Sequence, residues 1–188
     1  MDVLTTGNVA VGRSGLARLN AMTPAEAAAE LAACCASRRW VAAVVQARPF
    51  ASVDGLHRAA AAQLAALDWP DIREALAAHP RIGERTSGAG RGREAAWSHA
   101  EQSGARNADA LIAAELAVAN AAYEAKFGYV FLIRAAGRTA TQMLAAALDR
   151  LDHDESTEQA VVRDELSQIV RLRLDKLILG LAEGTRSP

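Results

Sequence analysis

The sequence predicts an all-α fold, a single-domain bundle of about eight helices with one short extended segment near residues 129–134. Two features of composition favour helices: 45 of the 188 residues are alanine, and 19 of the 21 lysine and arginine residues are arginine. Both are good helix formers. In addition, apolar side chains recur every three or four residues along most of the chain, which is the spacing of one helix face. The exception is residues 129–133, a continuous aromatic and branched aliphatic run.

The first elements follow from capping motifs and glycines. Residues 1–18 carry three glycines and no apolar periodicity, so we expect a loose N-terminal arm in front of one helical domain over residues 19–184. The sequence T-P-A-E at residues 23–26 is a capping box with proline at the first helical position. It predicts a helix that runs to about residue 36.

Three apolar stripes with helical spacing come next, at residues 40–45, 53–67 and 72–79. Each stripe stops at or shortly before a proline or a turn, as a helix does. Residues 81–93 contain four glycines and predict a long loop. Its glycines fit no phosphate-binding pattern, so a nucleotide cradle is not expected.

The second half of the chain contains the longest predicted helices. We expect a short helix over residues 94–104, and then a helix capped by Asn107 that ends at Phe127 with Gly128 behind it. Two further capping boxes, Thr139–Gln142 and Ser156–Gln159, open the last two helices, and the final one runs about 25 residues to Gly184.

Composition also excludes several classes of protein. The net charge of −1 argues against nucleic acid or an anionic membrane as the main partner, and no apolar run approaches the ~20 residues that cross a bilayer. The two cysteines, Cys34 and Cys35, are adjacent, so they form neither a disulfide framework nor a metal site and suggest a reducing, cytoplasmic setting. No two histidines have ligand spacing, so we expect no metal.

One arginine of the last helix is out of place. At 100° per residue, Leu166, Val170 and Leu177 share an apolar face, with Arg173 in the middle of it, whereas Arg171 points away. A buried guanidinium needs an anionic partner. That partner is either an acidic side chain, which would make an internal salt bridge, or a substrate carboxylate that arginine binds through two hydrogen bonds.

Polar side chains also gather on the short helix over residues 94–104. Ser98, Glu101 and Gln102 have i, i+3, i+4 spacing, which places a hydroxyl, a carboxylate and an amide on one side. This side is either a solvated face or part of a site. His79 ends a helix and precedes Pro80, so it is either a helix cap or a group held for proton transfer.

Taken together, these motifs resemble a known enzyme family. The string A-H-P-R-I-G at residues 78–83 resembles the HPxIG signature of the OHCU decarboxylases. The resemblance covers roughly residues 19–178, and its motifs are specific in this order and spacing. The further matches are Trp40 with Arg48–Phe50, S-x-x-E-Q-x-G at 98–104, Asn120, Tyr123, Lys126–Phe131, Arg150–Leu151, Glu158 and Leu172–Leu174.

The resemblance implies a reaction. It is the decarboxylation of 2-oxo-4-hydroxy-4-carboxy-5-ureidoimidazoline (OHCU) to (S)-allantoin and carbon dioxide in urate breakdown. The adjacent ring carbonyl and imine can spread the electron pair that carbon dioxide leaves behind, so no cofactor is expected. The resemblance also suggests a homodimer. On composition alone, a non-catalytic all-α ligand-binding or dimerisation module fits equally well.

The resemblance also implies which residues act. His79 matches the histidine that transfers a proton, and Glu101 and Arg173 match the other catalytic positions. Glu101 either orients His79 or binds the ureido N–H groups. Arg134 stands where many relatives have a small or thiol side chain, and it lies either at the rim of the site or in solvent. The implied substrate-binding positions are Pro80, Ser98, Gln102, Phe131, Leu132, Ile133, Arg134 and Ala135, and the extended run from Phe131 would offer unpaired backbone amides.

Overall fold

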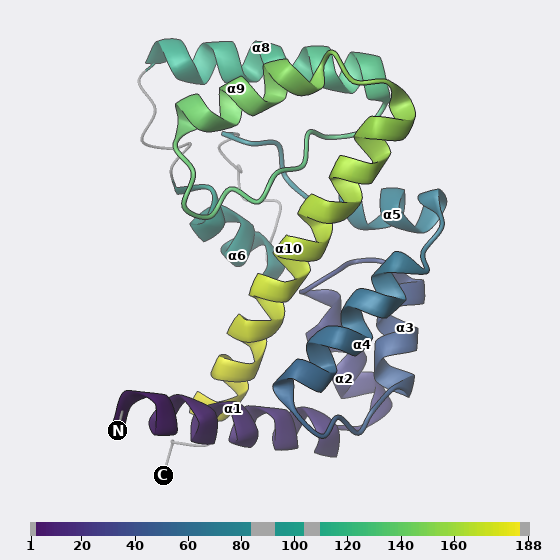
Figure 1. Cartoon of the computed structure of the whole chain (residues 1–188), viewed down its shortest axis with the longest axis vertical. Helices are drawn as coiled ribbons and strands as arrows, with labels where there is room; N and C mark the ends of the chain where they lie inside the picture. The colour runs from purple at the N-terminus through teal and green to yellow at the C-terminus, as the bar shows by residue number, and fades with distance from the viewer. Residues whose placement is uncertain (1–2, 84–92, 104–109, 185–188) are drawn as a thin grey trace. The chain divides into compact units, whose positions relative to one another are not determined.

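The structure, a computed structural model, describes residues 3–83, 93–103 and 110–184 (Figure 1). This part of the chain is all-α, as predicted, with nine helices and no strand. The helices are α1 (Val3–Ala21), α2 (Pro24–Ala32), α3 (Arg38–Gln46), α4 (Val53–Ala65), α5 (Trp69–Leu76), α6 (Arg93–Glu101), α8 (Ala110–Phe127), α9 (Ala140–Arg150) and α10 (Glu155–Glu183).

The chain divides into two compact units, one of residues 1–71 with 170–188 and one of residues 72–169. That division does not test the single domain expected over residues 19–184, which stays a prediction. Most of the predicted glycine-rich loop and the predicted cap Asn107 lie outside the described residues. No helix in the described ranges is long and apolar enough to cross a membrane.

In the first unit, α2, α3 and α4 pack in sequence. The capping box at Thr23 is present as predicted. The buried indole of Trp40 on α3 donates to the carbonyl of Ala60 on α4 at 3.0 Å, which satisfies its only polar atom in the core. Helix α2 ends at Ala32, earlier than expected, because the chain turns at the buried Cys34 and Cys35 before Ser37 caps α3.

The prediction of a loose arm over residues 1–18 is wrong, because residues 3–21 form α1. Leu16 and Leu19 of this helix are buried. Gly15 marks a close helix crossing, since a Cβ at this position would lie 2.0 Å from the backbone oxygen of Ile178 on α10. The glycine that suggested flexibility in the sequence is therefore a packing residue.

This crossing predicts opposite effects for two glycines of α1. Gly15→Ala should destabilise the protein by about 1–3 kcal/mol because the helices must move apart. Gly12→Ala should stabilise it by about 0.5–1 kcal/mol, since its Cβ would meet Val53 at an ordinary 3.6 Å. Thermal unfolding followed by circular dichroism compares the two variants. Equal melting temperatures would contradict the crossing.

The second unit is built around α8 and α9, which pack side by side (Figure 1). The capping box Thr139–Gln142 is present as predicted. The third predicted box is wrong: a cap at Ser156 would start α10 at residue 157, but α10 begins two residues earlier, at Glu155, and the Asp154 carboxylate accepts from the backbone N–H of Thr157 at 2.8 Å. An aspartate is as good an N-cap as the predicted serine.

Residues 128–139 link α8 to α9 without helix or strand, so the short non-helical segment near 129–134 is confirmed. Tyr123, Phe127, Tyr129 and Phe131 form an aromatic cluster at the start of this segment, with neighbouring ring centroids 4.7–6.0 Å apart. Such tilted and edge-to-face pairs are favourable. The cluster therefore anchors a segment that has no strand partner among the described residues.

Candidate active site

His79 lies just after α5, where the helix has ended. Its backbone N–H donates to Leu76 O at 2.9 Å, and its ring Nδ1 lies 3.0 Å from Ala75 O. A carbonyl oxygen can only accept, so this contact assigns the proton to Nδ1. The imidazole is 8% exposed, so both its orientation and its tautomer are fixed by the end of α5.

Side chains from elsewhere in the second unit hold the turn that follows His79. The amide of Gln102 accepts from Gly83 N at 3.2 Å and donates to Pro80 O at 3.4 Å. Asn120 of α8 donates to Ile82 O at 2.9 Å. Gly83 has a φ of +80°, which glycine adopts without strain. The HPxIG turn is therefore clamped at three backbone positions.

An ion pair holds the same turn from outside. The guanidinium of Arg81 donates from Nε to Glu124 Oε1 at 2.6 Å and from Nη2 to Oε2 at 2.8 Å. This is the two-bond geometry that arginine and carboxylate favour. The pair is partly exposed, so it contributes modestly to stability and chiefly fixes the direction of the turn.

The polar side of α6 and the residues after it is largely buried. Ser98 and Gln102 are buried and Glu101 is partly exposed. The interpretation as a solvated face is therefore wrong for Ser98 and Gln102. Gln102, which we expected to contact substrate, bonds to the backbone of the turn after His79, so its amide links the end of α6 to the HPxIG turn.

The segment over residues 131–135 is buried except for Arg134, which is partly buried. The sequence suggested that its backbone amides are unpaired. In the structure, two backbone groups of this segment have side-chain partners. The amide of Arg134 donates to Glu165 Oε2 at 2.7 Å, and Leu132 O accepts from Arg150 Nη1 at 2.8 Å. The Arg134 side chain donates to Gln168 Oε1 at 3.1 Å. It therefore packs against α10 and does not extend into solvent.

A buried charge network stands behind this segment. Arg150 Nε donates to Glu158 Oε1 at 2.9 Å, and Nη2 of Arg150 and the Tyr123 hydroxyl bond to the same oxygen. His153 Nδ1 lies 2.8 Å from Glu158 Oε2. Burial, together with the neighbouring Glu158, raises the pKa of the Tyr123 phenol, so this hydroxyl stays protonated and donates. The Arg150 guanidinium also stacks on Phe131, 4.7 Å from its centroid.

Sequence reasoning noted Tyr123, Arg150 and Glu158 as family matches but gave them no role, and it missed Glu165. A signal was present. Glu158 and Glu165 are seven residues apart, on the face of α10 that also buries Val162 and Leu166. Carboxylates at helical spacing within an apolar face indicate buried partners, by the same argument that singled out Arg173.

Arg173 belongs to the first unit and is 1% exposed, between the buried Val170 and Leu177, whereas Arg171 is exposed. The helical-wheel prediction is thus confirmed for both arginines. Asp175, one turn after Arg171, lies close to His57 of α4, with 3.0 Å between Nε2 and Oδ1.

The sequence matches the OHCU decarboxylase family over residues 20–175. It is 33% identical over 139 residues to 2-oxo-4-hydroxy-4-carboxy-5-ureidoimidazoline decarboxylase of Haloferax volcanii, covering 72% of this chain and 79% of that protein. It is 32% identical over 145 residues to the uric acid degradation bifunctional protein TTL of Arabidopsis thaliana, covering 77% of this chain and 45% of that protein. The chain thus spans less than half of the plant protein.

A solved structure agrees. The crystal structure of an OHCU decarboxylase in the presence of (S)-allantoin matches with a TM-score of 0.69 and 29% identity, covering 79% of this chain and 96% of that one. Fold and sequence together define an all-α carbon–carbon lyase, a carboxy-lyase. The chain belongs to the OHCU decarboxylase family and catalyses the decarboxylation step of urate degradation for which the family is named.

Proposed function

We propose that the chain converts OHCU to (S)-allantoin and carbon dioxide without metal or organic cofactor, with His79 transferring the proton. The observation that carries this proposal is the hydrogen bond from His79 Nδ1 to Ala75 O. It leaves Nε2 as the ring atom that exchanges a proton, on a residue whose backbone lies between α5 and the clamped turn. A fixed donor is what stereospecific proton delivery requires.

The proposed chemistry balances with one added proton. The bond from the ring carbon to the carboxylate breaks and releases carbon dioxide. Its electron pair moves into the ring, where the adjacent carbonyl and imine spread the charge, and His79 delivers a proton to one face. The protein supplies orientation and stabilises the developing negative charge. Glu101 either orients His79 or binds the ureido N–H groups, and the two roles stay open.

The proposed substrate contacts are Pro80, Ser98, Gln102 and residues 131–135. The clamped turn and the network behind Leu132 support this assignment, because both hold backbone in place before the substrate arrives. Polar groups that are already held in place lose little conformational entropy when they bind a ligand rich in amides.

We propose that Arg173 binds the substrate carboxylate, since its guanidinium is buried where Arg171 is exposed. Arg173→Lys should lower kcat/KM about 10–150-fold, because the lost charged hydrogen bond is worth about 1.5–3 kcal/mol. The matched control Arg171→Lys should leave turnover near that of the wild type. Equal losses in both variants would remove Arg173 from the site.

The reaction itself is tested on freshly generated OHCU in buffer treated with a chelator. Decay of the substrate is followed by absorbance, and the optical activity of the allantoin is followed by circular dichroism. We expect enzyme-dependent, optically active product at an unchanged rate with the chelator. Racemic product at the rate of spontaneous decay would reject the stereospecific reaction, and a rate restored by added zinc would reject the cofactor-free one.

We further propose a cytoplasmic homodimer. Cys34 and Cys35 are buried in the first unit as thiols rather than as a disulfide, which suits a reducing compartment. Helix α8 exposes Leu111 and Val118, seven residues apart on one face, at 67% and 70%. Large exposed apolar side chains on one helix face favour contact with a second copy. Val118→Glu should therefore shift the mass measured by light scattering from dimer to monomer.

A further inference from the structure

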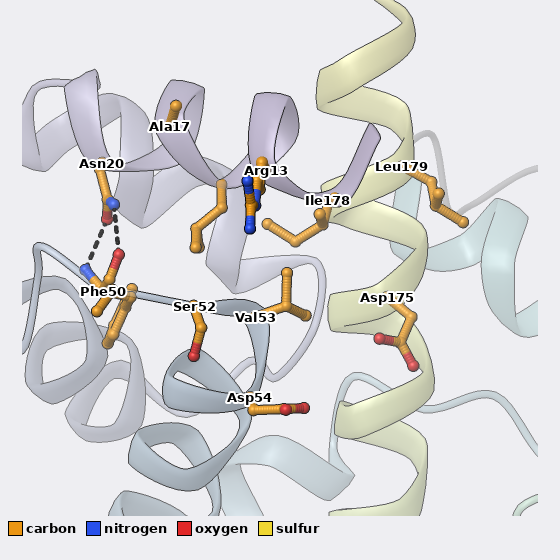
Figure 2. Close-up of a pocket in the computed structure, with 13 residues that line it drawn as sticks. Arg13, Ala17, Asn20, Phe50, Ser52, Val53, Asp54, Asp175, Ile178 and Leu179 are labelled. Atoms are coloured by element: carbon orange, nitrogen blue, oxygen red, sulfur yellow. Dashed lines mark hydrogen bonds between the residues drawn. The ribbon is translucent and has the colours of Figure 1, made fainter. Parts of the chain in front are cut away.

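The first unit contains an open cavity of about 740 Å³ (Figure 2). It is lined by residues from α1, from the turn before α4, from the start of α4 and from the C-terminal part of α10, and by none of the proposed active-site residues. Its volume lies within the range of about 300–1,000 Å³ that is typical of small-molecule sites. Its α1 wall before residue 20 and its α10 wall beyond residue 175 lie outside the family match.

Hydrogen bonds fix the walls of this cavity. The side-chain amide of Asn20 bonds to both backbone groups of Phe50, donating to O and accepting from N at 2.9 Å each, as the dashed lines in Figure 2 mark. The Arg48 guanidinium donates to the carbonyls of Leu19 and Met22 at 2.7 and 2.9 Å. Together with the close crossing of α1 and α10 at Gly15, these bonds hold the walls of the cavity in place.

Three charged side chains from three helices line the same cavity. They are Arg13 of α1, Asp54 of α4 and Asp175 of α10 (Figure 2). Neither Arg13 nor Asp54 forms an ion pair with another residue in the described ranges. The Asp175 carboxylate lies 3.0 Å from His57 Nε2, and its side chain is 48% exposed. The cavity is therefore lined by both positively and negatively charged side chains.

The remaining surface of the cavity is mostly apolar. It is supplied by Leu16 of α1, by Phe50 just before α4, by Val53 at the start of α4, and by Ile178 and Leu179 of α10. Leu179 is 42% exposed. An apolar ligand would leave the charges unused, and a ligand of one sign would face at least one like charge. A molecule with both signs and an apolar body matches all parts of the lining.

We propose that this cavity binds a small zwitterion of the amino-acid class with an apolar side chain. The ammonium group binds between Asp54 and Asp175, the carboxylate binds Arg13, and the side chain packs on Val53 and Ile178. This site is separate from the decarboxylation proposed above, so neither proposal depends on the other.

Three probes with one fluorophenyl body test the proposal by ¹⁹F NMR titration of the full chain. They are 4-fluorophenylalanine, which carries both charges, 4-fluorophenethylamine, which carries only the positive charge, and 3-(4-fluorophenyl)propionate, which carries only the negative charge. We expect the zwitterion to bind about tenfold or more tighter than either other probe, since only the zwitterion can form charged hydrogen bonds with Arg13 and with the two aspartates at once. Equal affinities for the three probes would overturn the proposal.

Variants locate the binding. Arg13→Gln should lower the affinity for the zwitterion to that for the amine, and Asp54→Asn should lower it toward that for the propionate. Gly12→Leu places a side chain in the cavity opposite Val53, where the first added carbon has room, and should abolish probe binding while α1 stays folded and OHCU turnover is unchanged. Undiminished binding to Gly12→Leu would place the probe elsewhere and refute the site.

Discussion

Replacing His79 by alanine is expected to lower the rate of OHCU decarboxylation about 10²–10⁴-fold, the usual share of general acid–base catalysis. The ring is the only group of the HPxIG turn that can exchange a proton near neutral pH. The turn itself should persist, because Gln102, Asn120 and Glu124 hold it through contacts that do not involve the imidazole. The loss should therefore appear in kcat more than in KM.

The stereochemistry of the product sharpens this test. Residual turnover by His79→Ala should give allantoin of reduced optical purity, because uncatalysed protonation has no preferred face. His79→Asn can restore a hydrogen bond to Ala75 O but no proton transfer, so it should stay nearly as slow as the alanine variant. Near-wild-type rate and full optical purity in His79→Ala would make His79 a helix cap only and would pass proton transfer to Glu101.

Local signals in the sequence were sufficient for most of the secondary structure, although they missed α1 and the cap of α10. The capping boxes at Thr23 and Thr139 begin helices where predicted, because a cap needs only a side chain and the backbone three residues away. The helical wheel predicted the burial of Arg173 because it also needs only neighbouring residues, here the apolar side chains that share its helix face. Gly15 shows the limit of local reasoning, since one residue type serves both a flexible arm and a close helix crossing, and only the partner helix decides between them.

The supports of the candidate site were beyond local reasoning. Gln102 contacts Gly83 across 19 residues, Asn120 contacts Ile82 across 38, and Arg134 contacts Glu165 across 31. Each of these bonds joins a side chain to a backbone group, which leaves no pairing pattern in the sequence. The expectation of unpaired amides after Phe131 was wrong at Arg134 for this reason, because the amide partner lies on a helix far along the chain.

Glu158→Ala is expected to destabilise the protein by about 3–5 kcal/mol, because it leaves the buried guanidinium of Arg150 without its carboxylate. At this chain length that is a fall of roughly 6–20 °C in melting temperature. The side chain of Glu158 is fully buried, whereas Glu155 lies one turn earlier on α10 and is exposed. Glu155→Ala is therefore the matched control, and its melting temperature should change by no more than roughly 2 °C.

A double variant separates stability from positioning. Arg150→Met combined with Glu158→Leu replaces the ion pair by apolar side chains, which commonly restores stability. It also removes the hydrogen bond from Arg150 to Leu132 O, so the backbone of residues 131–135 loses a fixed point. We expect a melting temperature above that of Glu158→Ala but below that of the wild type, because the buried Tyr123 hydroxyl still loses its acceptor. We also expect a raised KM for OHCU. A stable double variant with unchanged kcat and KM would show that the network serves folding alone, because the segment would then keep its geometry without Arg150.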